Sequence, residues 1–227
     1  MGILPMVRSK RELCELIEEI GFLPYFSNEM RGFSVMDVTR GMQWWSDIPE
    51  LDPWDWRVQI SGERKIAYGK LFRGKAGFIS PKWYPVFANF RRQGYDFESR
   101  YEEGLASYKS KQIMRHFENA DTELASNELK QAAGFSKDGL KGFEGAITAL
   151  QMQTYLTVSG FRQRRNKLGA PYGWHVGYFS TPEAVFGEDV VTACYGEEPE
   201  VSRDRIVGRM AEYVHAASDA EIRKFIS

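Results

Sequence analysis

Apolar residues in the first quarter of the chain predict one helix followed by short elements. Ser9 can cap this helix and Gly21 can end it. The apolar stripe between them repeats at helical spacing and consists of Leu13, Leu16, Ile17 and Ile20. Residues 24–53 mix Gly, Pro, Asn and Asp with two adjacent tryptophans, so we expect only short elements there.

The next stretch alternates between apolar and polar positions and then returns to helical spacing. Residues 57–60 and 65–72 lie on either side of Ser61-Gly62 and predict strand, turn, strand, with helix as the competing interpretation for 66–72. Residues 83–92 predict a helix. Residues 97–117 predict a longer one, with Tyr101, Leu105 and Tyr108 on one face.

Residues 122–186 show the order of signals that is typical of a winged helix-turn-helix. Ser126 can cap a short helix that stops at Gly134, and Ser136 can cap a second helix. The apolar stripe of that second helix is Leu140, Phe143, Ile147 and Leu150. Two strands follow, at 155–161 and 174–179, and we interpret this hairpin as the wing.

The polar positions of this unit favour phosphate contact over base reading. The loop between the two wing strands carries four cations, which can neutralise phosphates and release counterions: Arg162, Arg164, Arg165 and Lys167. The outward face of the second helix is expected to hold Lys137, Lys141, Glu144, Thr148 and Gln151. Because it is poor in Arg and Asn, we predict non-specific or shape-based binding of duplex DNA. A winged helix used for protein contacts is the alternative.

These elements predict an α+β fold that is mainly helical. We divide the chain into a helical N-terminal domain with a short hairpin at 1–120, a winged-helix domain at 121–190 and a helical tail at 191–227. In the tail, an apolar stripe can pack back on the N-terminal domain or on a second copy in a homodimer: Ile206, Met210, Tyr213, Val214 and Ala217.

Charge is unevenly distributed although the chain as a whole carries −1. Residues 57–92 hold nine Lys and Arg against one acid, a local balance of +8. We expect this segment to form a second basic wall beside the wing, in which Lys70, Arg73 and Lys75 contact DNA. The alternative is that these charges merely solvate separate loops.

Several aromatic and basic segments resemble a known family. KLFRGKAGFIS at 70–80, followed by Trp83-Tyr84-Pro85, is similar to the segment before the central winged helix of bacterial AlkZ/YcaQ-type alkylpurine DNA glycosylases. DPWDWR at 52–57, LQM at 150–152 with YLT at 155–157, and PYGW at 171–174 more closely resemble a group of short bacterial proteins called AlkZ-related. The closer resemblance covers about residues 10–190.

The resemblance implies winged-helix units around a basic DNA channel, with base excision as an implied chemistry. The glycosylases carry a Gln-hydrophobic-Gln or Gln-hydrophobic-Asp motif near the N-terminus, where polar groups can position water. Here the comparable place reads Val35-Met36-Asp37, so whether the chain is an enzyme is open. Gln151-Met152-Gln153 spells the motif at the end of the second helix, and we interpret it as structural.

An aromatic and charged cluster forms a second candidate site. Trp54 and Trp56 could stack on a base or ligand beside Asp52, Asp55 and Arg57. Tyr172 and Trp174 are candidates for the same pocket. The alternative is a core cluster with a buried Asp–Arg pair, because large aromatics usually supply core area first.

The remaining residues indicate a cytoplasmic protein without a metal or cofactor. Cys14 and Cys194 lie 180 positions apart, and the three histidines lack metal-ligand spacing. No segment has the length and apolarity of a membrane span or the h-region of a signal peptide. Three functions stay open: a duplex-DNA-binding protein related to repair, a reduced glycosylase acting on alkylated bases, and a protein-interaction adaptor.

Overall fold

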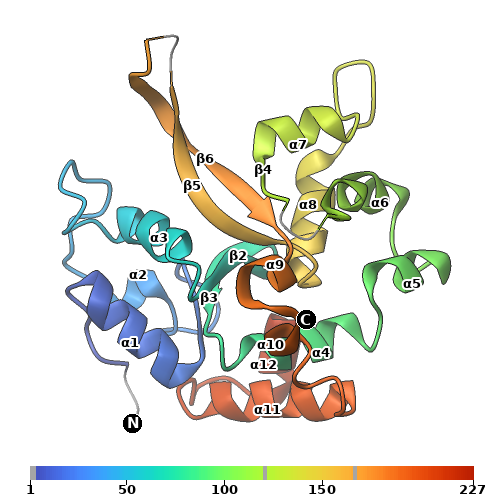
Figure 1. Ribbon diagram of the computed structural model, residues 1–227. Helices are drawn as coiled ribbons and strands as arrows, with labels where there is room; N and C mark the ends of the chain where they lie inside the picture. Colours follow the sequence, from blue (N-terminus) through green and yellow to red (C-terminus); the bar gives the residue numbers. More distant parts are fainter. Residues whose placement is uncertain (1–3, 120–121, 166–167) are drawn as a thin grey trace.

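One antiparallel sheet runs through the molecule and carries most of its helices. The computed structural model describes residues 4–119, 122–165 and 168–227. The strand order is β1-β3-β2-β5-β6-β4. The strands are β1 (Phe22–Pro24), β2 (Ala67–Phe72), β3 (Lys75–Ile79), β4 (Leu124–Ala125), β5 (Thr157–Arg165) and β6 (Pro171–Ser180). The α+β class is therefore confirmed (Figure 1).

Short helices surround this sheet (Figure 1). They are α1 (Lys10–Ile20), α2 (Val35–Val38), α3 (Pro53–Gly62), α4 (Tyr84–Arg92), α5 (Phe97–Glu102), α6 (Tyr108–Met114), η1 (Arg115–Phe117), α7 (Ser126–Ala132), α8 (Phe143–Met152), α9 (Pro182–Phe186), α10 (Glu188–Val191), α11 (Pro199–Ala211) and α12 (Asp219–Ile226). Within the described residues, no helix combines the length and apolarity needed to cross a bilayer.

The sheet joins the two halves of the sequence. Tyr68 in β2 pairs with Val158 in β5, and the Thr157 hydroxyl donates to the Tyr68 carbonyl at 3.2 Å. The predicted N-terminal and winged-helix domains thus share one sheet, while their boundary near residue 120 stays a prediction.

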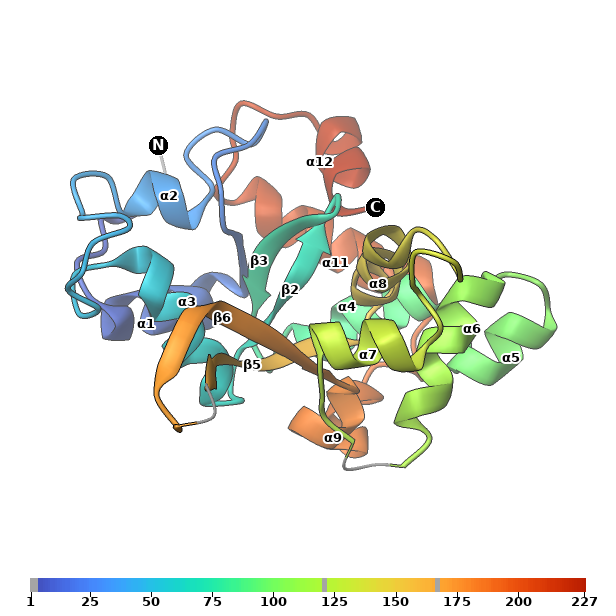
Figure 2. The ribbon, with the colours of Figure 1, turned by 90° about the horizontal axis from the view of Figure 1, so that it is seen from above.

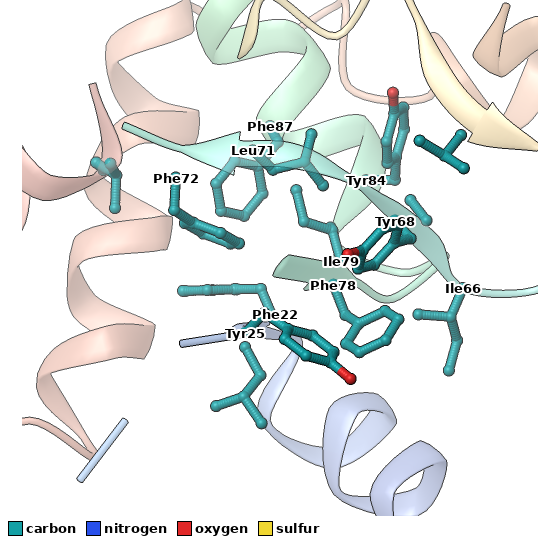
Figure 3. Close-up of a cluster of buried hydrophobic side chains, with 14 of the residues drawn as sticks. Phe22, Tyr25, Ile66, Tyr68, Leu71, Phe72, Phe78, Ile79, Tyr84 and Phe87 are labelled. Carbon is teal, nitrogen blue, oxygen red and sulfur yellow. The ribbon is translucent and has the colours of Figure 1, made fainter. Parts of the chain in front are cut away.

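The core lies where β1, β2 and β3 meet α4 and α12. Phe22 packs against Phe72 and Phe87, with ring centres 6.3 and 5.0 Å apart, and Figure 3 shows these rings between β2–β3 and the neighbouring helix. Gly77 faces Phe72 so closely that an added Cβ would lie 2.4 Å from the ring. The core therefore extends to the backbone of β3, and position 77 has no room for a side chain.

The prediction of a strand at 57–60 is wrong, because these residues belong to α3. The Asp52 side chain accepts from Trp54 N at 2.8 Å, and Pro53 occupies the first helical position. Both features favour a helix start. The turn of the observed hairpin lies instead between β2 and β3, at Arg73 and Gly74.

The predicted single helix at 97–117 is also interrupted. Chain direction changes at Gly104, whose φ of 72° suits glycine, and Ser107 then caps α6 by accepting from Ser110 N at 3.1 Å. Leu105 and Tyr108 are exposed, so the expected apolar face does not form.

The second helix of the predicted helix-turn-helix begins later than expected. α8 starts at Phe143 after Gly142, whose φ is 85°, and Ser136 lies in the preceding loop rather than at a cap. Phe135 and Phe143 pack edge to face at 5.3 Å and fix this loop on the helix. The expected stripe of α8 is nevertheless found, since Phe143, Ile147 and Leu150 are buried.

The β5–β6 hairpin is longer than expected and projects beyond the helices (Figure 1). The predicted loop residues 162–165 belong to β5, and 171–173 belong to β6. β4 adds to the outer side of this hairpin through Leu124↔Phe179 and Ala125↔Tyr178.

The C-terminal stripe packs back within the chain. Ile206 and Met210 are fully buried where α11 contacts α4. Asn89 on α4 donates to Glu197 O at 3.0 Å and Ser202 Oγ at 2.9 Å, which fixes the start of α11. The stripe thus packs on the N-terminal half of the chain, and the homodimer stays a prediction.

Candidate nucleic-acid interface

The projecting hairpin presents cations without any acid of its own. β5 carries Arg162, Arg164 and Arg165, and neither β5 nor β6 contains Asp or Glu. Arg162 is half exposed and its guanidinium lies 4.1 Å from the ring centre of Tyr178. Arg164 is exposed. Lys167 lies outside the described residues.

Glu123 restrains part of this positive charge at the base of the hairpin. Its carboxylate accepts from Arg64 Nη2 at 2.6 Å, from Ser159 Oγ at 2.6 Å and from Arg162 Nη2. Partial burial raises the pKa of Glu123, but the hydrogen bonds from Ser159, Arg162 and Arg64 outweigh that effect and lower it. The carboxylate is therefore a charged acceptor shared by two arginines.

A groove of about 610 Å³ lies between α7 and the hairpin. Ser126, Asn127 and Lys130 line it from α7, Glu144 lines it from α8, and Arg164 and residues 172–177 line it from the hairpin. Figure 2 shows α7 running beside β6. Lys130 and Arg164 thus face one concave surface, which suits a phosphate backbone.

The C-terminal part of the polar side of α8 contacts the β2–β3 hairpin. Lys70 Nζ donates to Thr148 Oγ1 at 3.2 Å and lies 3.6 Å from Glu144 Oε2. Gln151, expected to face outward, is buried, and its Oε1 accepts from Lys70 N at 2.9 Å. Gln151 and Thr148 are therefore engaged with the β2–β3 hairpin, whereas the start of α8 stays on the surface, with the Glu144 side chain 73% exposed.

Lys137 and Lys141 lie in the loop before α8 instead of on its face. Lys141 Nζ donates to the carbonyls of Ser136, at 2.8 Å, and of Lys137. Both lysines are exposed or partly exposed, so they remain on the surface near the end of α7. Their expected role in DNA contact stays a prediction.

The basic segment 57–92 does not gather on one face. Arg57, Arg91 and Arg92 are buried. Arg73 pairs with Glu29 at 2.6 Å, and Lys75 is exposed at the same turn. In Figure 2 this β2–β3 turn lies far from the outer end of the β5–β6 hairpin. Arg73 and Lys75 are therefore separated from Arg162 and Arg164.

On its other side the hairpin forms an aromatic cleft of about 780 Å³ with the segment that leads into α3. The cleft is lined by Trp45, Ser46, Asp47, Asp52, Trp54, Asp55, Arg57, Gln163, Gly173, Trp174 and His175. Trp45 is 63% exposed and Trp174 is 85% exposed. We refer to this feature below as the aromatic cleft.

Arg57 lies at the inner end of the aromatic cleft between two rings. Its guanidinium carbon is 3.6 Å from the ring centre of Trp54 and 4.6 Å from that of Phe161. Burial lowers the pKa of this arginine. Among the described residues, no hydrogen-bond acceptor reaches its buried Nε and Nη1. The expected buried Asp–Arg pair is therefore not formed as a direct ion pair.

The structure brings together five of the seven predicted residues of this cluster. Asp52, Trp54, Asp55, Arg57 and Trp174 line the aromatic cleft. Trp56 is fully buried and its Nε1 donates to Glu50 O at 3.0 Å. Tyr172 lines the neighbouring groove with α7. Trp45 and His175 were not among the predicted residues, because only the fold places them beside α3.

Comparison with models of protein families shows to which family the chain belongs. The model of the family described as AlkZ related matches residues 7–227. The chain belongs to the AlkZ-related family. No curated protein and no solved structure matches it. Membership suggests a DNA-repair-related protein, and the match covers the α7–α8 unit, the hairpin and both walls of the aromatic cleft.

In this AlkZ-related chain the polar residues that resemble a glycosylase motif are engaged in structural contacts. Asp37 accepts from Ser34 Oγ at 2.7 Å, from Arg40 Nη2 at 2.9 Å and from Ser27 Oγ at 3.2 Å. Gln151 bonds to backbone at both ends of its amide, since its Nε2 donates to Ile147 O at 3.0 Å. Among the described residues, no group of three His, Cys, Asp or Glu is arranged to hold a metal.

Proposed function

We propose that this AlkZ-related protein binds duplex DNA through a winged-helix unit, mainly by contacts to the sugar-phosphate backbone. The order α6, β4, α7, α8, β5, β6, with β4 paired to β6, supports assignment of α7 and α8 as a helix-turn-helix and of β5–β6 as its wing. The link of the family to DNA repair supports a nucleic-acid ligand.

The acid-free hairpin beside the α7 groove is the observation that carries this proposal. Arg162 and Arg164 project from a strand that stands clear of the helices, and Lys130 faces Arg164 across the groove. With a net charge of −1, the chain has little long-range attraction for DNA, so local fields must supply the affinity. On α8, Gln151 is buried and the exposed polar residue at the start of the helix is Glu144, which favours binding without a major-groove code.

Salt titration of duplex binding tests the proposal. Wild type, Arg162→Ala/Arg164→Ala and a control, Arg11→Ala/Lys82→Ala, are titrated into a labelled duplex over a range of salt concentrations. Each phosphate contact contributes about 0.9 to the slope of log K against log salt. The hairpin variant should lose about 0.9 of this slope, through Arg164, because Glu123 holds Arg162 in the wild-type protein. The control removes two exposed cations outside the hairpin, one on α1 and one in the turn before α4, and should keep the slope. Salt-independent binding, or equal slopes for the two variants, would refute the proposal.

A further inference from the structure

Two strongly exposed indoles face the aromatic cleft from separate segments of the chain. Trp45 lies in the loop before α3, and Trp174 lies on β6. With 63% and 85% of their surfaces exposed, they contribute little to the core. Exposed tryptophans that converge on one hollow are typical of a binding surface, because their rings offer broad faces for stacking.

The backbone holds Trp45 in place by an unusual conformation. Its φ is 60°, in the left-handed region that bulky residues rarely adopt. The buried carboxylate of Asp52 accepts from Trp45 N at 3.0 Å, and the same oxygen accepts from Trp54 N at 2.8 Å. The cap of α3 therefore also fixes the loop that presents this indole.

Arg57 provides an unsatisfied donor at the inner end of the cleft. Only 7% of this residue is exposed, and neither Nε nor Nη1 reaches an acceptor within the described part of the chain. Buried donors are normally satisfied, so such a group is expected where a ligand completes the hydrogen bonding. Arg57 lines the cleft, so a ligand seated there lies next to its guanidinium.

The charges of the cleft select against phosphate. Asp47, Asp52 and Asp55 line it against the single arginine, so its lining is net negative. Carboxylates accept hydrogen bonds from amino and imino groups, and Arg57 donates to ring nitrogens and carbonyl oxygens. A flat heterocycle that carries both kinds of group fits this lining, and a phosphate does not.

The hairpin places this cleft next to the surface proposed for the backbone. Gln163 lines the aromatic cleft, Arg164 lines the groove with α7, and Gly173, Trp174 and His175 line both. Neighbouring residues of a strand point to opposite faces, so one strand can contact phosphate on one side and a base on the other.

We propose that the aromatic cleft binds one unpaired nucleobase, stacked on Trp174 and Trp45 and hydrogen-bonded by Arg57 and the aspartates. This inference rests on the proposed binding of duplex DNA by the hairpin. The base can come from a duplex that releases it or from a single strand, and the chemistry of recognition is the same in both cases.

Binding of three labelled DNAs tests the inference: a fully paired duplex, the same duplex with one extra unpaired nucleotide, and a single strand. Wild type should bind the DNA with the unpaired nucleotide about tenfold more tightly than the paired duplex, the scale of one base–aromatic stack. Trp45→Ala should lose this preference while keeping its affinity for the paired duplex, because Trp45 lines the aromatic cleft and not the groove with α7. Trp45 is 63% exposed, so this change should leave the fold intact.

Tyr108→Ala is the matched control, because Tyr108 is a similarly exposed aromatic on α6, outside the cleft. Equal affinity of wild type for the two duplexes, or equal loss of preference in Trp45→Ala and Tyr108→Ala, would overturn the inference. If the single strand binds most tightly, the inference is supported and the base comes from single-stranded DNA.

A nucleoside titration separates failure of the cleft from failure of the hairpin. Added guanosine or adenosine should quench the fluorescence of wild type and quench Trp174→Phe less, with no duplex present. Absence of duplex binding together with this quenching would refute the proposed function and support the cleft. Duplex binding without quenching and without the tenfold preference would support the proposed function and refute binding of a base in the cleft.

Discussion

Glu123 restrains the charge that the proposed interface needs, so its removal should have opposite effects on stability and on DNA affinity. Its carboxylate is shared by Arg64, Arg162 and Ser159. In Glu123→Gln an acceptor oxygen remains for one donor, but the negative charge that holds both guanidiniums is lost. Arg162 is then freed to contact a phosphate.

The magnitudes follow from the exposure of the partners. About half of each arginine side chain is exposed, 44% for Arg64 and 54% for Arg162, so solvent screens both ion pairs. Exposed pairs contribute about 0.2–1 kcal/mol each, and we therefore expect the free energy of unfolding to fall by about 1–2 kcal/mol. One added phosphate contact should steepen the salt slope of DNA binding by about 0.9.

Glu29→Gln is the matched control. Glu29 pairs with Arg73 at 2.6 Å, and these two side chains are 41% and 48% exposed. The pair lies at the β2–β3 turn, away from the β5–β6 hairpin. Both variants change the net charge by the same amount. Urea unfolding and salt titrations of duplex binding should show a steeper slope for Glu123→Gln alone. An equal gain in the two variants would mean that net charge, and not release of Arg162, controls affinity.

Three further predictions concern stability. Glu183→Ala leaves the buried Arg92 without its carboxylate at 2.5 Å and should lower the free energy of unfolding by about 3 kcal/mol in urea; a loss below 1 kcal/mol would contradict a buried pair. Gly77→Ala drives a Cβ against the Phe72 ring and should lower the thermal midpoint through a loss of about 1–3 kcal/mol, whereas an unchanged midpoint would show that the ring can move. The lowered pKa of Glu123 means that its stabilisation is present above the ordinary value of 4.5 and is lost as pH falls through the folded value, so wild type and Glu123→Gln should converge in acid unfolding curves.

Elements with a clear period and clear ends could be predicted from the sequence. α1 has its Ser9 cap, its apolar stripe and its Gly21 stop, and the structure shows all three. α3 was missed although Asp52 and Pro53 signal a helix start, because four residues that alternate also fit a strand. Burial of Trp56 and packing of α3 on β5 decide between the two, and neither can be read from a short window.

The cations and aromatics of the site were predicted more reliably than their surroundings. The sequence identifies Arg162 and Arg164 as the cations of a hairpin, but it does not show that Glu123, outside the hairpin, restrains one of them. It identifies Asp52, Trp54 and Arg57 as a cluster, yet only the tertiary structure brings Trp174 to them. Contacts between segments more than 100 positions apart in the sequence leave no local pattern.

The contact between β2 and α8 bears on how the proposed interface would distinguish one DNA from another. Lys70 and Gln151 hold the β2–β3 hairpin on the C-terminal part of the polar face of α8, so Gln151 is not available to base edges. In the proposed function the cations of the β5–β6 hairpin contact phosphates, which carry no sequence information. Duplexes of equal length and unrelated sequence should therefore bind with affinities within about twofold, whereas an unpaired base should matter more than any paired sequence. A preference of about tenfold or more between paired duplexes in competition titrations would show that α8 is released on binding and that the hairpin does not act alone.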